Sequence, residues 1–260
     1  MRKIALTFTV TTLVLGIFGA FFRWLQLMNA FDAGTGLPEP GAGTSAVLLI
    51  YCVLAAAAIC LLTVLWLGRY EGAAGAEDAL KSADAVPLIV GWALFAIFAA
   101  AACILLFAAG TASYPVLQRL FGACGILAAA SVPFLFGKKG SAAGSMGRTA
   151  SVMLTVFYCF WLIFAYKCIS PNPVVWSYAL EMPAVAASAV ALCSVTAFYY
   201  GTGKITRSLI ELQLGAFFSV AVLFEERSAA MSVLFGVSAA LQLLLEFVLI
   251  SNMREKRDPE

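Results

Sequence analysis

Long apolar runs alternate with short polar stretches along the whole chain. Eight of the runs are close to the roughly 17–25 residues that a helix needs to cross the hydrocarbon core of a membrane. They cover residues 4–24, 46–68, 87–109, 114–136, 151–169, 179–200, 208–224 and 229–251. The runs are apolar on every side, so their length and not a helical stripe identifies them. The pattern predicts an all-α fold, a bundle of about eight transmembrane helices forming a single integral membrane domain over residues 1–260.

The composition excludes the main classes of water-soluble protein. Of the 260 residues, 63% are hydrophobic and 12% are charged, and the mean hydropathy is +0.97. Soluble domains are about 45–50% apolar and about 25% charged. A net charge of +2 is also too small to indicate a polyanionic partner. Membrane lipid is therefore the first partner that the sequence predicts, and no nucleic acid is expected.

The residue types that usually hold metals and haem are missing or badly spaced. The chain has no histidine, which removes imidazole-bound zinc, bis-histidine haem and histidine-based catalytic triads. Its seven cysteines never form a C-x-x-C pair and mostly lie inside apolar runs, where a thiol behaves as a small hydrophobe. No phosphate-binding loop or nucleophile elbow is present. We expect no cofactor, no metal and no standard catalytic residue, so the sequence does not favour an enzyme.

The basic residues predict the direction in which the helices run. With the N-terminus in the cytoplasm, twelve of the 16 Lys and Arg residues fall in cytoplasmic stretches. The others are Arg23, Arg119, Lys167 and Arg227. Cytoplasmic loops of membrane proteins carry this excess of positive charge. We therefore expect both termini in the cytoplasm, which requires an even number of crossings.

Several polar residues fall near the outer ends of the predicted spans. They are Arg23, Gln26, Gln118, Arg119, Lys167 and Glu181, with Asp32 and Glu39 in the loop above them. A charge within a span is costly, so cations and a carboxylate at one depth could pair around a water-filled vestibule, where a forked arginine suits an anionic ligand. The candidate ligand-binding set within this group consists of Arg23, Asp32, Arg119 and Glu181. The alternative is that the basic side chains snorkel to the interface.

A second polar group is predicted nearer the cytoplasm, on the last two spans. These spans form a tight hairpin, and counting back from its turn places Glu211 opposite Gln242. Glu246 follows one helical turn later on the same face as Gln242. Glu211, Gln242 and Glu246 are therefore a candidate set for binding a proton or another cation. The alternative is structural: interhelical hydrogen bonds with Gln213, or an ion pair of Glu211 with Arg207 one turn earlier.

Two stretches of the sequence resemble a known group of proteins. The first contains Arg23-Trp24, Phe31-Asp32 and Thr35-Gly36-Leu37-Pro38. The second contains Phe160-Trp161, Tyr166, Asn172-Pro173, Tyr178-Ala179-Leu180-Glu181 and Tyr199-Tyr200-Gly201-Thr202-Gly203. In them the chain is similar to a group of uncharacterised polytopic membrane proteins of anaerobic Gram-positive bacteria. The resemblance implies a multi-pass protein of the bacterial cytoplasmic membrane, and it supplies no substrate.

Three functions agree with these features. The first is a small permease or channel for a polar solute or ion, since the predicted bundle has no soluble domain and contains embedded acids and bases. The second is a non-catalytic sensory, accessory or assembly subunit, whose polar residues join helices and whose partner is a second copy or another membrane subunit. The third is a lipid-directed membrane enzyme that uses Asp32, Glu39 and Glu181. The sequence favours the first.

Overall fold

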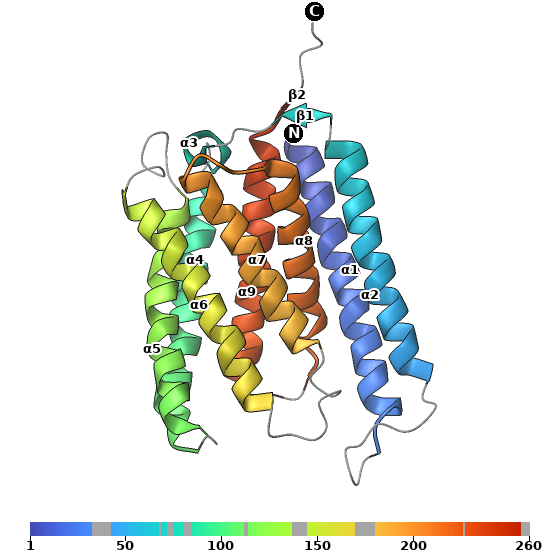
Figure 1. Ribbon diagram of the computed structural model, residues 1–260, viewed down its shortest axis with the longest axis vertical. Coiled ribbons are helices and arrows are strands. Elements are labelled where there is room, and N and C mark those ends of the chain that lie inside the picture. Colours follow the sequence, from blue (N-terminus) through green and yellow to red (C-terminus); the bar gives the residue numbers. More distant parts are fainter. Residues whose placement is uncertain are drawn as a thin grey trace, which may run out of the picture.

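Eight long helices form a bundle with roughly aligned axes in the computed structural model of the chain, and successive long helices run in opposite directions (Figure 1). The structure describes residues 1–32, 43–67, 69–71, 75–80, 85–111, 114–136, 145–169, 180–225 and 227–255. The helices are α1 (Arg2–Asn29), α2 (Gly43–Leu62), α4 (Val86–Phe107), α5 (Pro115–Ser131), α6 (Ser145–Ile169), α7 (Glu181–Tyr199), α8 (Ile205–Ala221) and α9 (Ala229–Ser251). The all-α prediction is confirmed, and each predicted span overlaps one of these helices.

Three of the long helices change their winding at one end. Helix α2 continues as a π-helical turn, η1 (Thr63–Leu67), and α4 continues as a 3₁₀ turn, η2 (Ala108–Thr111). Helix α5 passes into a second 3₁₀ turn, η3 (Val132–Leu135). Pro133 explains the last change, because its ring lacks the N–H that an α-helix needs at that position.

Short elements cover the end of the bundle that carries both chain termini (Figure 1). Strand β1 (Tyr70–Glu71) pairs antiparallel with β2 (Arg254–Glu255), and the one-turn helix α3 (Ala76–Ala79) follows β1. The Asn252 side chain donates a hydrogen bond of 2.9 Å to the Ala79 carbonyl oxygen. The C-terminal end of α9 is thereby attached to the segment after α2, where the sequence predicted only a loop.

Length and composition make this chain a multi-pass helical membrane protein. Seven of the long helices form spans that have at least 18 residues and are apolar enough to cross a membrane; α5 reaches this length together with η3, and α8 has 17 residues. Because the two termini lie at the same end of the bundle, the chain passes along it an even number of times, and α8 supplies the eighth passage (Figure 1). Following the charge distribution, we call the end with the termini the inner end and the opposite end the outer end.

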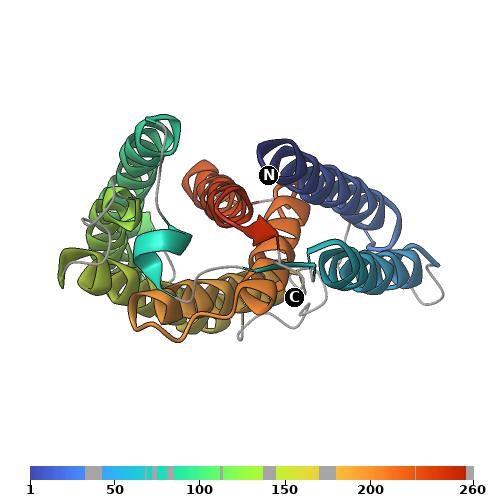
Figure 2. The same ribbon diagram turned by 90° about the horizontal axis from the view of Figure 1, so that it is seen from above.

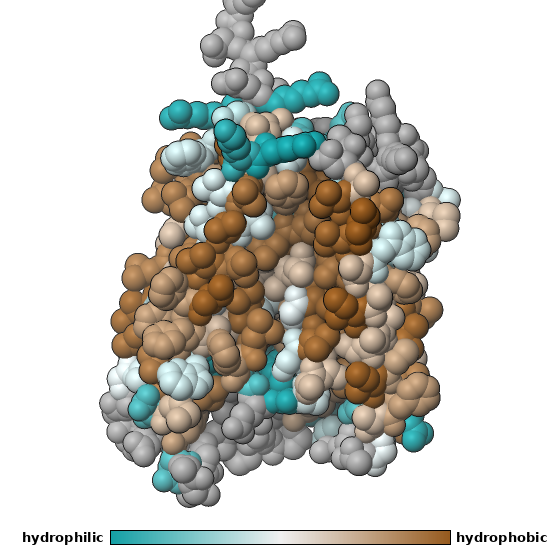
Figure 3. Space-filling view, turned by 180° about the vertical axis from the view of Figure 1, so that it is seen from behind, coloured by the Kyte–Doolittle hydropathy of each residue, from teal (hydrophilic) through white to brown (hydrophobic). Residues whose placement is uncertain are grey.

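The last two helices form the interior of the bundle. Helix α9 packs between α4 and α1, while α8 packs against α9, α1 and α7 (Figure 2). In the most apolar 18-residue window of α9, 67% of the residues are buried, against 28% in α2. Apolar side chains cover much of the surface between the two ends (Figure 3). Helices α8 and α9 are therefore the ones most shielded from lipid, and polar residues within them face protein.

Glycines bring two helix pairs close together. A Cβ atom on Gly16 of α1 would lie 2.7 Å from the Val220 Cβ of α8, and one on Gly122 of α5 would lie 2.7 Å from the Leu106 backbone nitrogen of α4. Real Cβ atoms do not approach this closely, so any larger residue would push the helices apart. Small residues thus form the packing surface at these two positions.

A reporter fused after Glu260 tests the even number of crossings. A fluorescent protein that matures only in the cytoplasm should be bright there, and an alkaline phosphatase fused at the same place should be inactive, because both termini lie at the inner end. The matched control carries the same reporters in the first outer loop, after Gly36, where the two signals should be reversed. Phosphatase activity after Glu260 would contradict the topology.

Candidate functional site

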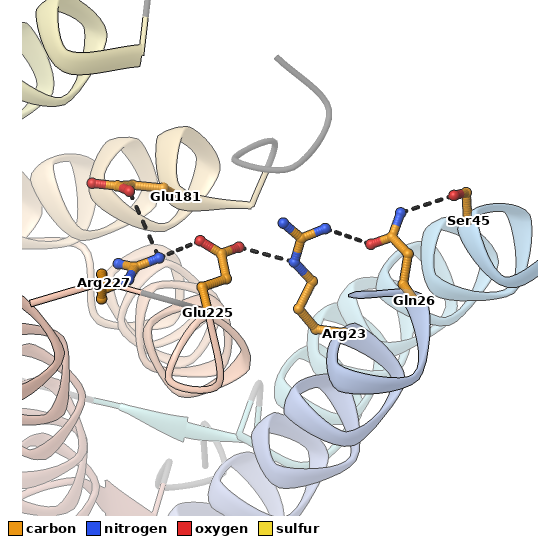
Figure 4. A network of polar contacts seen from close by, with 6 residues as sticks. All are labelled: Arg23, Gln26, Ser45, Glu181, Glu225 and Arg227. Atoms are coloured by element: carbon orange, nitrogen blue, oxygen red, sulfur yellow. Dashed lines mark hydrogen bonds and ion pairs between the residues drawn. The ribbon is translucent and has the colours of Figure 1, made fainter. Parts of the chain in front are cut away.

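A chain of buried charged and polar side chains crosses the outer end of the bundle (Figure 4). It starts at Arg23 of α1, whose Nε donates a hydrogen bond of 2.9 Å to Glu225 Oε1 in the turn after α8. The Arg23 Nη1 also donates to Gln26 Oε1, and the Gln26 Nε2 donates to Ser45 Oγ of α2 over 2.9 Å. The Arg23 and Glu225 side chains are 1% and 2% exposed. We call these residues, with Arg227 and Glu181, the outer network.

Arg227 extends the outer network to α7. Its Nη2 donates to Glu225 Oε2 and lies 3.6 Å from Glu181 Oε2 (Figure 4). The contact with Glu181 is an ion pair that is too long for a hydrogen bond. Two guanidinium groups thus face two carboxylates, and the single carboxylate of Glu225 serves both arginines. The outer network joins α1, α2, α7 and the α8–α9 turn without leaving a net charge in the interior.

The outer network includes only part of the predicted external set. Arg23 and Glu181 belong to it, and Glu225 connects them through Arg227. Asp32 lies exposed just after α1. Arg119 lies exposed on α5, a helix that contributes no residue to the outer network. The exposure of Arg119 agrees with the alternative that this side chain snorkels to the interface.

The structure also describes two other polar residues that were predicted near this surface. The Gln118 Nε2 donates to the Leu105 carbonyl oxygen of α4 over 3.0 Å, and Lys167 is exposed near the outer end of α6. Glu39 lies outside the described residues. Of Asp32, Glu39 and Glu181, the cluster that a lipid-directed enzyme would need, Glu181 is the residue that the outer network contains, 3.6 Å from Arg227 Nη2.

Sequence reasoning assigned Glu225 and Arg227 to a turn and missed their role. Turn residues are normally solvated, and nothing in the local pattern marks these two as buried. The sequence feature that could have identified them is their depth in the membrane. A tight turn between α8 and α9 brings its charges to the same outer level as Arg23. Pairing an arginine inside a span with the charges of an adjacent turn would have identified them.

A second polar cluster lies between α7, α8 and α9. The Gln242 Nε2 of α9 donates hydrogen bonds of 2.9 Å to Ser188 Oγ of α7 and to Ser238 Oγ one turn away. Ser219 Oγ of α8 lies 3.2 Å from Ser188 Oγ. All of these side chains are buried. Gly215 of α8 makes room for the Gln242 amide, because a Cβ at that position would lie 1.8 Å from Gln242 Oε1.

A third polar cluster surrounds Glu246, one turn farther along α9. The Gln213 Nε2 of α8 donates to Glu246 Oε1 over 2.7 Å, and the Thr63 hydroxyl donates to Gln213 Oε1 over 2.7 Å. Thr12 of α1 lies beside the same carboxyl. Thr63 is the first residue of the π-helical turn η1, a kind of irregularity that is frequent at functional sites. Glu246 itself is fully buried, and no cation contacts it among the described residues.

The structure places Glu211 away from this cluster. Its carboxylate accepts a hydrogen bond from Ser194 of α7 and pairs at 2.7 Å with Arg207 one turn earlier on α8. The alternative prediction, pairing with Arg207, is confirmed. Gln242 and Glu246 do lie on one face of α9, and Gln213 joins Glu246. The prediction that the Glu211 and Glu246 carboxylates gather at one place is wrong. Glu211 contacts Ser194 of α7, whereas Gln213, on a different side of α8, contacts Glu246.

The polar clusters follow a single line through the bundle. Ser238, Gln242 and Glu246 are spaced by four residues, so they share one face of α9 and span about 12 Å along it. The outer network lies beyond Ser238 at the α8–α9 turn. Buried polar groups therefore occur at the outer end and again from Ser238 to Glu246, with the apolar Ala230 and Leu234 between them on the same face of α9.

Two further features bear on the chemistry of the site. In the parts of the chain that the structure describes, no group of three or more Cys, Asp or Glu side chains could hold a metal ion. A cavity of about 320 Å³ lies between α5, η3 and α6, lined by residues such as Ser131, Phe134 and Met153. It opens between other helices than those that carry the polar clusters, and none of its described lining residues is charged.

Comparison with known proteins leaves the chain at the level of its class. No protein-family model, no curated protein and no solved structure shows a significant match. The fold and composition define a multi-pass helical membrane protein, and no family is identified for it.

Replacing Glu225 with Gln should destabilise the protein strongly. The change leaves two buried arginines without the carboxylate they share, and loss of one partner from a buried ion pair costs about 3–5 kcal/mol. We expect a large fall in the melting temperature measured in detergent. The control is Glu211→Gln, which affects a pair with the exposed Arg207 and should cost about 1 kcal/mol or less. The double variant Arg23→Gln/Glu225→Gln should recover part of the loss, and strictly additive effects would contradict the pairing.

Replacing Gly215 with Ala should displace Gln242. The new methyl group would overlap the Gln242 amide and break its hydrogen bonds to Ser188 and Ser238, at a cost of about 1–3 kcal/mol. The matched control is Gly236→Ala on α9, where an added Cβ meets nothing within 4 Å. Thermal unfolding of the two variants in the same detergent measures the difference, and equal stability would contradict the packing at Gly215.

Proposed function

We propose that the protein is a small permease that carries a polar solute together with a proton. Its proton-binding group in this proposal is Glu246. One observation carries the proposal: a fully buried carboxyl that contacts Gln213 and Thr12 and has no cation beside it among the described residues. Burying an ionised carboxylate without a counter-ion costs several kcal/mol, so Glu246 binds a proton unless a cation replaces it.

The hydrogen bonds around Glu246 suit a group that gains and loses a proton. Oε1 accepts a hydrogen bond from Gln213, and Oε2 has no partner within hydrogen-bond distance among the described residues. The free oxygen is where a proton would bind. Gln213 is held by Thr63, so the amide stays in place while the carboxyl changes its charge. A purely structural carboxyl would be expected to use both oxygens.

Ser238, Gln242 and Glu246 share one face of α9 and support the inner part of a route for the solute. The outer network supports the outer part. The side chains along this route supply donors and acceptors that can replace water around a polar molecule. At the outer end the route is closed, because Arg23 and Glu225 are almost fully buried. The contact between Arg227 and Glu181, at 3.6 Å, is the longest ion pair of the outer network, so opening would begin there. Permeases operate by exposing such a site to one side at a time.

We also propose that the protein resides in the bacterial cytoplasmic membrane. The support comes from the sequence resemblance and from the excess of basic residues at the inner end, including Arg2, Arg69, Arg148 and Lys204.

Proton movement into proteoliposomes tests the permease. Vesicles loaded with a pH-sensitive dye are mixed with amino acids, dicarboxylates, sugars or inorganic anions, each added singly under an imposed pH gradient. We expect at least one solute class to accelerate proton movement in vesicles containing the wild type, and not in empty vesicles. Glu246→Gln should reduce the acceleration at least tenfold, because the amide cannot bind and release a proton at neutral pH.

Glu211→Gln is the matched control for that experiment. It neutralises a carboxylate on the other side of α8 and should leave the coupled proton movement unchanged. Labelling with a hydrophobic carbodiimide, which reacts with protonated carboxyls in apolar surroundings, should modify Glu246 and spare the ion-paired Glu225. The proposal fails if no solute moves protons with the wild type, or if Glu246→Gln performs as well as the wild type.

A non-catalytic accessory or assembly subunit is the second candidate function. The observation that favours it is the mutual hydrogen bonding of Ser188, Ser219, Ser238 and Gln242, which joins α7, α8 and α9 without leaving a polar group exposed. In such a protein Glu246→Gln would change the melting temperature and would have no transport to change.

A further inference from the structure

Arg227 has two buried donors that no residue described by the structure satisfies. Its side chain is 8% exposed, and only Nη2 is engaged, with Glu225 and Glu181. The Nε and Nη1 atoms are buried and have no hydrogen-bond partner in the described part of the chain. Buried guanidinium N–H groups are normally hydrogen bonded, so these two donors call for an acceptor.

The two donors lie on either side of the one that is used. A guanidinium binds a carboxylate through two adjacent donors, either Nε with Nη2 or Nη1 with Nη2. In Arg227 each of these forks is half empty, because Nη2 alone is engaged. Glu225 makes a hydrogen bond to Nη2, whereas Glu181 approaches it only to 3.6 Å. Glu181 is therefore the more weakly held of the two carboxylates.

Among the described residues, one more buried donor without a partner belongs to a residue that contacts the same aromatic ring as Arg227. The guanidinium carbon lies 4.5 Å from the centre of the Phe235 ring, and the Trp161 ring centre lies 4.7 Å from the same ring. The Trp161 Nε1 is buried and has no hydrogen-bond partner. Two nitrogens of Arg227 and one of Trp161 are therefore unpaired donors among the described residues, and both residues contact the Phe235 ring.

We propose that Arg227 is the binding residue for a free carboxylate solute at the outer end of the bundle. The ligand's carboxylate would occupy the half-empty fork and displace Glu181, which holds that place when no ligand is bound. A planar two-oxygen anion fits a guanidinium fork better than a spherical halide does. One part of the proposal rests on the proposed permease function, namely that this ligand is also the transported solute. Binding at Arg227 itself requires no transport.

Thermal stability in a neutral detergent tests binding separately from transport. Purified wild type is titrated with sodium acetate and with sodium benzoate, and ionic strength is held constant with chloride; no lipid phosphate is present to compete. We expect a saturable rise in melting temperature with either carboxylate and none with chloride. Glu181→Gln should tighten the apparent affinity about tenfold, since the competing carboxylate is gone. Arg227→Lys should weaken it at least tenfold, because lysine keeps the charge and loses the fork.

Arg119→Lys is the matched control, since it makes the same change in an exposed arginine near the same surface and should leave the titration as in the wild type. A wild type that responds equally to carboxylates and chloride would mean that the free donors bind water only, and would overturn the proposal. An unchanged affinity in Glu181→Gln would overturn the displacement of Glu181. These two measurements need only folded wild type and Glu181→Gln, so they decide even if Arg227→Lys does not fold. Binding without coupled proton movement would sustain this inference and reject the permease.

Discussion

A single carboxylate, that of Glu225, determines how the outer end of the bundle is assembled. It accepts hydrogen bonds from two buried arginines, Arg23 on α1 and Arg227 in the same α8–α9 turn as Glu225 itself. Hydrocarbon cannot solvate a guanidinium group, so each arginine must find its partner inside the protein. Because Arg23 can reach Glu225 only when α1 lies against the α8–α9 hairpin, this contact also positions α1, and α2 follows through Gln26 and Ser45.

The same constraint explains why polar residues concentrate on α8 and α9. Helices on the periphery face lipid and present apolar side chains such as Leu49 and Ile89. The two interior helices are surrounded by protein, so serines, glutamines and a carboxyl can pair across their interfaces. What distinguishes the line of polar groups from ordinary interhelical bonding is incomplete pairing. Within the described part of the chain, Glu246 Oε2 and two donors of Arg227 have no hydrogen-bond partner.

Much of the fold could be predicted from the sequence, whereas the site could be predicted only in part. The number of long helices and their approximate bounds followed from apolar runs, and Glu246 and Arg23 stood out as charges within them. The partners of those charges were harder to identify. Glu211 was expected beside Gln242 because both lie a similar distance from the hairpin turn, but distance along a helix does not say which way a side chain points. Successive residues on a helix differ by about 100° in direction, so Glu211 faces α7 while Gln213 faces α9.

The sequence by itself determined that this chain lies in a membrane, how many long helices it forms and which of their charges need an explanation. Those properties depend on hydrophobicity and length, which are local. Only the tertiary structure decided that the side chains of Glu225 and Arg227, in the α8–α9 turn, are buried at the centre of a network. It also decided that Arg119 stays outside this network and that β1 pairs with β2. Each of these depends on contacts between segments far apart in the chain, whose relative rotation is set by close packing and not by the sequence of either segment alone.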